Sequence, residues 1–254
     1  MLTRRTLLAT SLTTGVTAAF APRRIEVIAH RGEHLSHAEN TIPAIAAAIA
    51  LGCDWVELDV RTTRDGAQVL MHDATVDRMT NGHGKVDELT LEQIRALTIQ
   101  GARVPTLDQA LATLRPSRCG LYLDAKQVTA NAILGTLHRH RMMKRCVVYG
   151  GLPLLRELAQ AGHSHLAMPE AVSVELLQKS LLELKPSVIA FDRRDFTSEI
   201  LAVARAARKR IFVDRLGAED TPEAWQDAVR RGATGIQSDR PAALIEHLRQ
   251  QGHR

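Results

Sequence analysis

The sequence contains few aromatic residues. Two Trp, two Tyr and four Phe make up 3% of its 254 residues. A core must therefore be built from Leu, Ile, Val and Ala, which suits packed α/β layers better than an aromatic-rich sandwich. The formal net charge of +5 is a small difference between 33 basic and 28 acidic residues. Because no basic run is interleaved with stacking aromatic residues, we expect no nucleic-acid partner.

Cysteine is also scarce. Cys53, Cys119 and Cys146 are the three cysteines of the sequence, and none has CxxC spacing. An odd and sparse set of this kind excludes a disulfide scaffold. Cys53 and Cys146 stand at the entrances of apolar strands, where cysteine is usually a small buried hydrophobic residue. We assign no chemistry to them.

The longest uncharged run of the sequence stands near the N-terminus. Arg4 and Arg5 precede residues 6–21, which are small or apolar and carry no charge. This pattern is typical of an export signal, and the paired arginines resemble a twin-arginine signal. The run is shorter than the roughly 20 apolar residues that span a bilayer, so we expect no stable membrane span. We predict an export signal at 1–21, one domain at 22–254 and a periplasmic or extracellular location; a retained N-terminal helix is the alternative.

The rest of the chain alternates apolar strand-like runs with amphipathic helical stretches. Strands are predicted at 25–30, 54–60, 67–72, 121–126, 146–149, 165–169, 188–192, 211–214 and 234–238. Helices are predicted at 42–51, 107–114, 130–140, 153–161, 174–184, 198–208, 222–231 and 242–250. Repeating βα units of this length indicate an α/β protein, most economically a (β/α)8 TIM barrel.

The third strand-like run is predicted to be the returning arm of a hairpin. Only residues 61–66 separate it from the second run, too few for the dozen-residue crossover between parallel strands. Asp65-Gly66 is a strong hairpin-turn signal. Folding about this turn brings His72 back near Glu57 and Asp59, so a short excursion follows the second strand.

Glu57 and Asp59 stand two residues apart on an otherwise apolar strand. Alternation with a period of two places both carboxylates on one face. Two buried acids repel each other and lose hydration unless a cation neutralises them. Carboxylate ligands favour a hard divalent ion such as Mg²⁺ or Ca²⁺. The alternative is a pair of acids bridged to Arg31 or Lys126.

Other polar residues also end strands, where a barrel carries its reactive groups. His30 and His72 can act as general acid and base, because histidine titrates near neutrality. Arg31 and Lys126 supply fixed positive charge suited to a phosphate. A further set of strand-end acids could line the same pocket, but helix capping or ion pairing accounts for each: Glu170, Asp192 and Asp214.

Several motifs follow one another in a fixed order along the chain: His30-Arg31-Gly32, Glu39-Asn40-Thr41, Glu57-Leu58-Asp59-Val60, His72-Asp73, Asp124-Ala125-Lys126 and, near the end, Gly235-Ile236-Gln237-Ser238-Asp239-Arg240-Pro241. This ordered series resembles the glycerophosphodiester phosphodiesterase family. The resemblance runs from about residue 27 to about residue 248. It implies a (β/α)8 barrel that hydrolyses a phosphodiester to an alcohol and a phosphomonoester, typically glycerol 3-phosphate.

The resemblance also implies roles for individual residues. His30 and His72 would be the acid/base pair, and Arg31 and Lys126 would hold the phosphate. Glu39 would orient Arg31 or His30, and Asp73 would support His72. One divalent metal ion, Mg²⁺ or Ca²⁺, would be bound by the three acids Glu57, Asp59 and Asp124.

The sequence departs from the family pattern at three places. Ala38 replaces the usual Pro before Glu-Asn-Thr, and Asp124 is one methylene shorter than the usual Glu. The usual Trp-Thr-Val-Asn stretch is replaced by residues 212–216, Phe-Val-Asp-Arg-Leu. The last difference affects the contacts to the alcohol of the substrate.

The sequence predicts hydrolysis of a small glycerophosphodiester and leaves three alternatives open. The same chemistry could act on lysophospholipids, as a lysophospholipase D does. Lys126 could instead be the nucleophilic amine of a Schiff-base lyase. An exported protein could also bind an anion without turnover. The sequence does not indicate the alcohol, the choice between the two metal ions or the oligomeric state.

Overall fold

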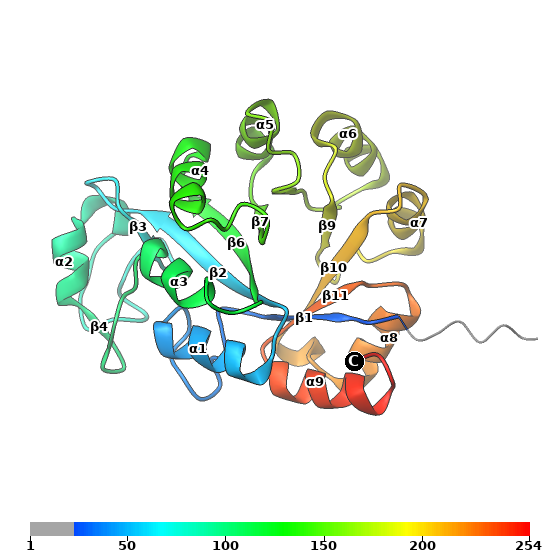
Figure 1. Cartoon of the computed structure of the whole chain (residues 1–254), viewed down its shortest axis with the longest axis horizontal. Helices are drawn as coiled ribbons and strands as arrows, with labels where there is room; N and C mark the ends of the chain where they lie inside the picture. The colour runs from blue at the N-terminus through cyan, green and yellow to red at the C-terminus, as the bar shows by residue number, and fades with distance from the viewer. Residues whose placement is uncertain (1–22) are drawn as a thin grey trace, which may run out of the picture.

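Parallel strands alternate with helices along residues 23–254, the part of the chain that this computed structural model describes (Figure 1). The predicted export signal at 1–21 lies outside the described residues. The strands are β1 (Glu26–Ala29), β2 (Trp55–Thr62), β3 (Gln68–Leu70), β4 (Thr98–Ile99), β5 (Ala102–Arg103), β6 (Gly120–Gln127), β7 (Cys146–Tyr149), β8 (Ala167–Met168), β9 (Val188–Phe191), β10 (Arg210–Arg215) and β11 (Gly235–Ser238).

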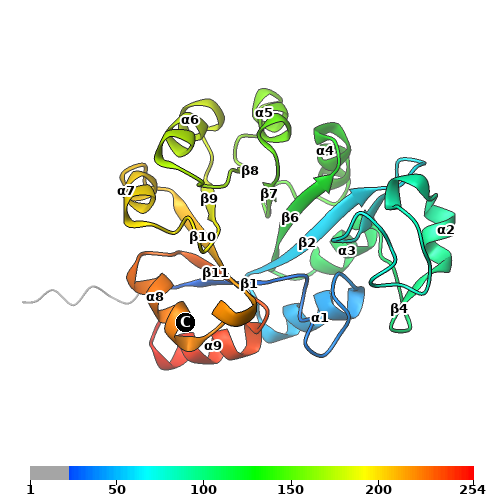
Figure 2. The same cartoon turned by 180° about the vertical axis from the view of Figure 1, so that it is seen from behind.

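The helices follow the strands and lie outside them (Figures 1 and 2). They are α1 (Ile42–Leu51), α2 (Leu91–Ala96), α3 (Leu107–Leu114), α4 (Ala130–Arg139), α5 (Leu152–Gln160), α6 (Val174–Leu184), α7 (Ser198–Ala206), α8 (Pro222–Arg230) and α9 (Pro241–Gln250), with 3₁₀ turns at Val86–Glu88 and Gly217–Glu219. No helix within residues 23–254 has the length and apolar character needed to cross a membrane.

Eight of the strands form a nearly closed barrel. Their order is β8-β7-β6-β2-β1-β11-β10-β9, and every neighbouring pair is parallel. The ends of this series meet at a single bridge between Glu170 and Ala190. There the Ala171 N–H donates to the Ala190 carbonyl at 2.9 Å, and the Ala190 N–H donates to the Pro169 carbonyl at 3.0 Å. The predicted (β/α)8 barrel is confirmed.

Alternation along the strands separates two apolar layers. In β1, Val27 and Ala29 pack in the cluster between strands and helices, whereas Ile28 packs in the cluster inside the barrel. In β2, Val56, Leu58 and Val60 belong to the outer layer. Successive side chains of a strand point to opposite faces, so Glu57 and Asp59 face the barrel interior.

The predicted hairpin is present as an antiparallel pair of β2 and β3. Its register differs by one residue from symmetry about Asp65-Gly66, because Val60 pairs with Leu70. A five-residue loop, 63–67, causes the offset: the Thr63 N–H donates to the Ala67 carbonyl at 2.8 Å. The excursion beyond it carries α2, β4 and β5 around a small apolar cluster of its own.

Threonine and serine begin most of the helices. The side chain at the N-cap accepts a hydrogen bond from an N–H of the first turn, which satisfies a donor that the helix leaves unpaired. The caps of this kind are Thr41, Thr90, Thr106, Thr129, Ser173, Thr197 and Thr221. Most strand-to-helix loops thus carry a local signal for the start of the helix; the loops before α5 and α9, with Gly151 and Arg240 at the N-cap, have no side-chain cap.

Candidate active site

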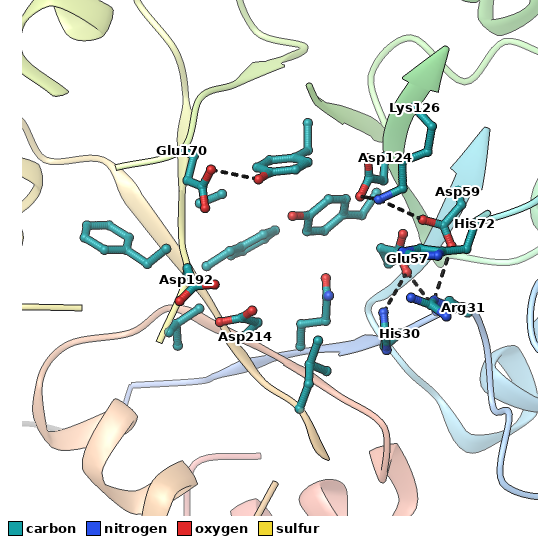
Figure 3. Close-up of a pocket in the computed structure, with 18 residues that line it drawn as sticks. His30, Arg31, Glu57, Asp59, His72, Asp124, Lys126, Glu170, Asp192 and Asp214 are labelled. Carbon is teal, nitrogen blue, oxygen red and sulfur yellow. Dashed lines mark hydrogen bonds and ion pairs between the residues drawn. The ribbon is translucent and has the colours of Figure 1, made fainter. Parts of the chain in front are cut away.

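A cavity of about 280 Å³ opens at the C-terminal ends of the barrel strands (Figure 3). Seven of the nine predicted site residues line it: His30, Arg31, Glu57, Asp59, His72, Asp124 and Lys126. The other two, Glu39 and Asp73, contact Arg31 and His72 from behind. The structure therefore brings together every residue that the sequence placed in the site.

Three carboxylates converge on one side of the cavity. Asp59 and Asp124 are register partners on the neighbouring strands β2 and β6. An oxygen of each lies within 4.8 Å of the others and of a Glu57 oxygen. Glu57 and Asp59 are only 2% and 1% exposed. Burial raises the pKa of Glu57 well above its usual value, and the charges of Asp59 and Asp124 add to the rise.

These carboxylates fit a divalent cation. Three oxygen donors from separate side chains converge, as a hard ion requires. Burial also raises the pKa of Asp124, despite the opposing charge of Lys126. A bound cation would offset both the desolvation and the mutual repulsion of the three acids. Glu57, Asp59 and Asp124 are accordingly the residues that could hold a metal ion.

Two basic side chains flank the carboxylates. Lys126 Nζ lies 2.8 Å from Asp124 Oδ2 and 3.3 Å from Asp59 Oδ1. Arg31 Nε lies 3.3 Å from Asp59 Oδ2. The ion pairs considered as an alternative to a metal are therefore present at Asp59, but Glu57 has no ion pair with either base among residues 23–254. Three acids against two bases leave an excess negative charge, which agrees with a cation site.

The turn between β1 and α1 positions Arg31. Its backbone has φ of 52° and its N–H donates to Glu57 Oε2 at 2.9 Å. Gly32 follows with φ of 87°, and a Cβ there would lie 2.8 Å from backbone and side-chain atoms of Ala44. Only glycine fits this close approach in the left-handed region. The side chain of Arg31 then donates to Glu39 Oε1 at 3.0 Å, which fixes it in the cavity.

Both histidines are held by carboxylates through the same ring nitrogen. His30 Nδ1 lies 2.6 Å from Asp239 Oδ1, and His72 Nδ1 lies 2.7 Å from Asp73 Oδ1. An Nδ1–H that donates to a carboxylate leaves Nε2 as the nitrogen that exchanges protons. His30 Nε2 is 3.9 Å from Glu57 Oε2. In each ring Nε2 is thus available as a general acid or base.

A network behind the cavity links its parts. Arg78 donates to Glu39 Oε1 at 2.7 Å and pairs with Asp73 Oδ2 at 2.5 Å. Hydrogen bonds from Arg78 lower the pKa of Asp73, and His72 adds to the effect. The buried Asn40 donates to Asp59 Oδ2 at 2.8 Å and accepts from the Asp59 N–H at 3.1 Å.

Sequence reasoning missed the role of Asp239. Its Oδ1 contacts His30 and also His34 Nε2 at 2.9 Å, and its Oδ2 accepts from the Gly217 N–H at 2.8 Å. Asp239 directly follows β11, the barrel neighbour of β1. Adjacency of the first and last strands in a closed barrel is the signal that could have found it.

The interpretation of three strand-end acids needs correction. Glu170, Asp192 and Asp214 line the cavity. They cap no helix, because Ser173, Thr197 and Thr221 take that place. Of the three, only Asp192 forms an ion pair within the described chain, with Arg194 Nε at 2.9 Å.

Comparison with known proteins agrees with this geometry. The model of the glycerophosphoryl diester phosphodiesterase family matches residues 30–213. A glycerophosphodiester phosphodiesterase of Caldanaerobacter subterraneus subsp. tengcongensis is 49% identical over 89 residues, 32% of this chain and 37% of that protein. Human glycerophosphodiester phosphodiesterase 1 is 42% identical over 113 residues, 41% of this chain and 34% of that protein. The matched segments thus span about a third of these relatives.

Solved structures share the whole barrel. A crystal structure of glycerophosphodiester phosphodiesterase from Agrobacterium tumefaciens str. C58 has a TM-score of 0.77 at 25% identity, covering 87% of this chain and 99% of that one. The Oleispira antarctica phosphodiesterase, solved in complex with the product sn-glycerol-3-phosphate, has a TM-score of 0.79 at 21% identity, covering 88% and 96%. With the family match extending over most of the barrel, the chain belongs to the glycerophosphoryl diester phosphodiesterase family.

Proposed function

We propose that this chain is a metal-dependent phosphodiesterase that hydrolyses glycerophosphodiesters to an alcohol and glycerol 3-phosphate. The observation that carries the proposal is one cavity in which three converging carboxylates, two bases and two carboxylate-held histidines meet. Similarity supports it, because the matched relatives are named glycerophosphodiester phosphodiesterases and the Oleispira antarctica enzyme was solved with sn-glycerol-3-phosphate as product.

The bases and the histidines of the cavity have separate roles in the proposed reaction. Arg31 and Lys126 bind the phosphodiester and offset the negative charge that develops on it. One histidine of the pair His30 and His72 removes a proton from the attacking water, and the other protonates the oxygen of the leaving alcohol as its bond to phosphorus breaks. An ion held by Glu57, Asp59 and Asp124, Mg²⁺ or Ca²⁺, supplies Lewis-acid polarisation of the phosphoryl oxygens when bound.

The alternatives are less compatible with the cavity. A Schiff-base lysine needs a lowered pKa, whereas at Lys126 the charge and hydrogen bond of Asp124 outweigh the effect of burial and raise the pKa. Most of the residues that line the cavity carry charged or titratable side chains. Burying the acyl chain of a lysophospholipid against them would be unfavourable, because it would remove their hydration.

A metal-reconstitution assay tests the proposal. Protein stripped with EDTA is supplied with Mg²⁺ or Ca²⁺, and release of glycerol 3-phosphate from glycerophosphocholine and related diesters is measured. We expect activity to require the ion and to fall by about 10²-fold or more in His30→Ala and Glu57→Ala. The matched control His83→Ala, whose side chain is 87% exposed, keeps activity within about twofold.

Three outcomes would reject parts of this proposal. Full activity of His30→Ala or Glu57→Ala would show that the reaction occurs elsewhere. Activity that survives EDTA, with borohydride trapping of substrate on Lys126, would replace metal catalysis by a Schiff-base mechanism. Binding of the diester without any release of alcohol would identify a non-catalytic binding protein.

We also propose that residues 1–21 direct export to the periplasm or the exterior. The paired Arg4 and Arg5 before an uncharged run support this. Cell fractionation of the full chain, with mass spectrometry of its N-terminus, tests it against the variant in which both arginines are lysine. We expect a shortened, exported protein and retention of the variant. An intact N-terminus on a retained wild-type chain would contradict the proposal.

A further inference from the structure

The half of the cavity away from the histidines is lined by acids and aromatic rings. Figure 3 shows Glu170, Asp192 and Asp214 on the side opposite His30 and Arg31. Glu170 follows β8, Asp192 follows β9 and Asp214 lies on β10. The same cavity is lined by three aromatic residues, Tyr122, Tyr149 and Phe212. We call Glu170, Asp192, Asp214 and these three rings the acidic wall.

The charges of the acidic wall are poorly compensated. Asp192 pairs with Arg194, whose side chain is 76% exposed. Glu170 accepts a hydrogen bond from the Tyr149 hydroxyl at 2.9 Å, and neither Glu170 nor Asp214 forms an ion pair with any base among residues 23–254. The Oδ1 atom of Asp214 is buried and lacks a hydrogen-bond partner in that range. Burial and the nearby Asp192 raise the pKa of Asp214 to about 6.

Tyr122 provides an independent sign that a ligand group is accommodated here. Its side chain is only 8% exposed and lines the cavity. None of the hydrogen bonds among residues 23–254 involves its hydroxyl, which is not enclosed by protein and opens onto the cavity. A polar group of a ligand in the cavity would form a hydrogen bond with it.

We propose that the acidic wall binds a cationic amino alcohol, so that the preferred substrates are glycerophosphodiesters of choline or ethanolamine. This inference rests on the proposed phosphodiesterase function, since the phosphate at Arg31 and Lys126 places the alcohol across the cavity. A zwitterionic diester matches the two halves: its phosphate meets the bases and its ammonium group meets the acids. Aromatic faces and carboxylates together are the groups that bind quaternary ammonium ions.

The spacing of the acids favours an organic cation over a second metal ion. In the described chain, the oxygen atoms of Glu170, Asp192 and Asp214 do not converge within 4.8 Å as those of Glu57, Asp59 and Asp124 do. A large ammonium group with diffuse charge needs no such convergence.

A substrate-matched assay tests the inference on the metal-loaded full chain. We compare kcat/KM for glycerophosphocholine and glycerophosphoethanolamine with that for glycerophosphoglycerol, whose alcohol is uncharged. Asp214→Asn and Glu170→Gln remove one charge each without changing side-chain size. Glu199→Gln removes one from the exposed surface of α7 and is the matched control.

We expect the wild type to prefer the cationic diesters by about tenfold or more, about the effect of one desolvated charge contact on an ammonium group. Asp214→Asn should reduce the ratio of kcat/KM for glycerophosphocholine to that for glycerophosphoglycerol by about tenfold, and Glu170→Gln should lower the same ratio. The control Glu199→Gln should leave the ratio within about twofold of the wild type. Thermal melting confirms that each variant is folded.

Equal losses of kcat/KM for cationic and uncharged diesters in both variants would overturn the inference. They would show that the acidic wall binds hydroxyl groups of the alcohol and not an ammonium group. Hydrolysis without any preference would overturn it and leave the phosphodiesterase function intact. If no diester is hydrolysed, direct binding decides: calorimetric titration with choline and with its uncharged carbon isostere should show tighter binding of choline, weakened by Asp214→Asn. Equal binding of the two probes would refute the acidic wall as an ammonium site.

Discussion

At the scale of single residues, Asp239 determines which nitrogen of His30 faces the cavity. Its carboxylate holds Nδ1 at 2.6 Å. We predict that Asp239→Asn lowers kcat by roughly 10- to 1000-fold, within the usual range of general acid–base catalysis, because an amide no longer fixes the tautomer or stabilises the charged ring. KM should change by less than about threefold, since Asp239 does not line the cavity.

The pH dependence of kcat separates this role from simple destabilisation. A positioning carboxylate acts through the ring that it holds, so Asp239→Asn should change the pH profile of kcat, whereas a loss of stability alone should not. His34→Ala removes the other ring on the same carboxylate and serves as the control. If Asp239→Asn changes only the melting temperature and leaves kcat and its profile intact, Asp239 has no part in positioning His30.

Asp214 should reduce stability in the absence of ligand. Burial raises its pKa from 3.8 to about 6, so the folded state holds the proton more tightly than the unfolded state does. The loss of stability caused by the charged Asp214 is therefore fully present above about pH 6. It disappears as the pH falls towards 3.8, the pKa of this side chain in the unfolded state. We predict that Asp214→Asn raises the free energy of unfolding by about 1–3 kcal/mol near pH 7.5.

Chemical denaturation across pH checks the size and the sign of this effect. The difference between wild type and Asp214→Asn should shrink as the pH is lowered from about 7 to about 4, because protonated Asp and Asn are then both uncharged. The groups around Asp214 in this range are Asp192, Glu170 and Arg215, with a backbone bond from Arg193. A difference that is constant with pH would mean that packing, not charge, causes it.

The sequence could place the reactive side chains but not all of their partners. Glu57, Asp59 and Asp124 are predictable because alternation decides which face of a strand they occupy. The contact between His30 and Asp239 spans 209 positions and depends on β1 and β11 being neighbours, which local patterns do not encode. Glu170 and Asp214 could be located at strand ends, but only the folded barrel shows that they lack basic partners.

At the scale of elements, the turn from β1 to α1 combines structure and function. Gly32→Ala would put a Cβ 2.8 Å from Ala44 at a φ of 87°. We predict a loss of about 2–4 kcal/mol in the free energy of unfolding, because left-handed strain and overpacking against helix α1 add. Activity of the folded fraction should also fall, since Arg31 precedes this glycine.

Gly66→Ala is the matched control for that turn. Gly66 has a φ of 84°, but a Cβ there would have no atom within 4 Å. Left-handed strain alone should cost about 1 kcal/mol, with activity unchanged. Urea denaturation of both variants measures the contrast. Equal losses would mean that the close approach to Ala44 contributes nothing.

The predicted elements agree with the structure where a strand leads into a capped helix. The hairpin was recognisable from the short connection and Asp65-Gly66, but its register was wrong by one residue because the loop contains five residues. The apolar residues of the excursion that carries α2, β4 and β5 show no strong periodicity, because its short elements pack only around a small separate cluster. Such segments take their form from tertiary contacts.

At the scale of the whole molecule, an ion in the carboxylate cluster should stabilise the barrel. Glu57, Asp59 and Asp124 come from β2 and β6, whose direct pairing forms part of the barrel. We predict that Mg²⁺ or Ca²⁺ at 100 times its Kd increases the free energy of unfolding by about 2.7 kcal/mol. Thermal melting of EDTA-treated protein with and without the ion measures this.

Glu57→Gln is the informative variant for that measurement. Removing one buried acid relieves repulsion, so the variant should melt higher than the wild type without metal and gain little from its addition. An undiminished gain in Glu57→Gln would show that the stabilising ion binds at another position.

Hydrogen exchange at the single bridge between Glu170 and Ala190 should also show whether a ligand is bound in the cavity. Every other pair of neighbouring strands in the described barrel shares at least two register pairs, so this seam is where local opening should be least costly. The acidic wall lies on the same seam through Glu170, and a bound ammonium group would join its two sides. Hydrogen exchange at the Ala171 and Ala190 amides should therefore be fast in the free protein and slow when choline fills the pocket, giving a turnover-independent readout of ligand binding.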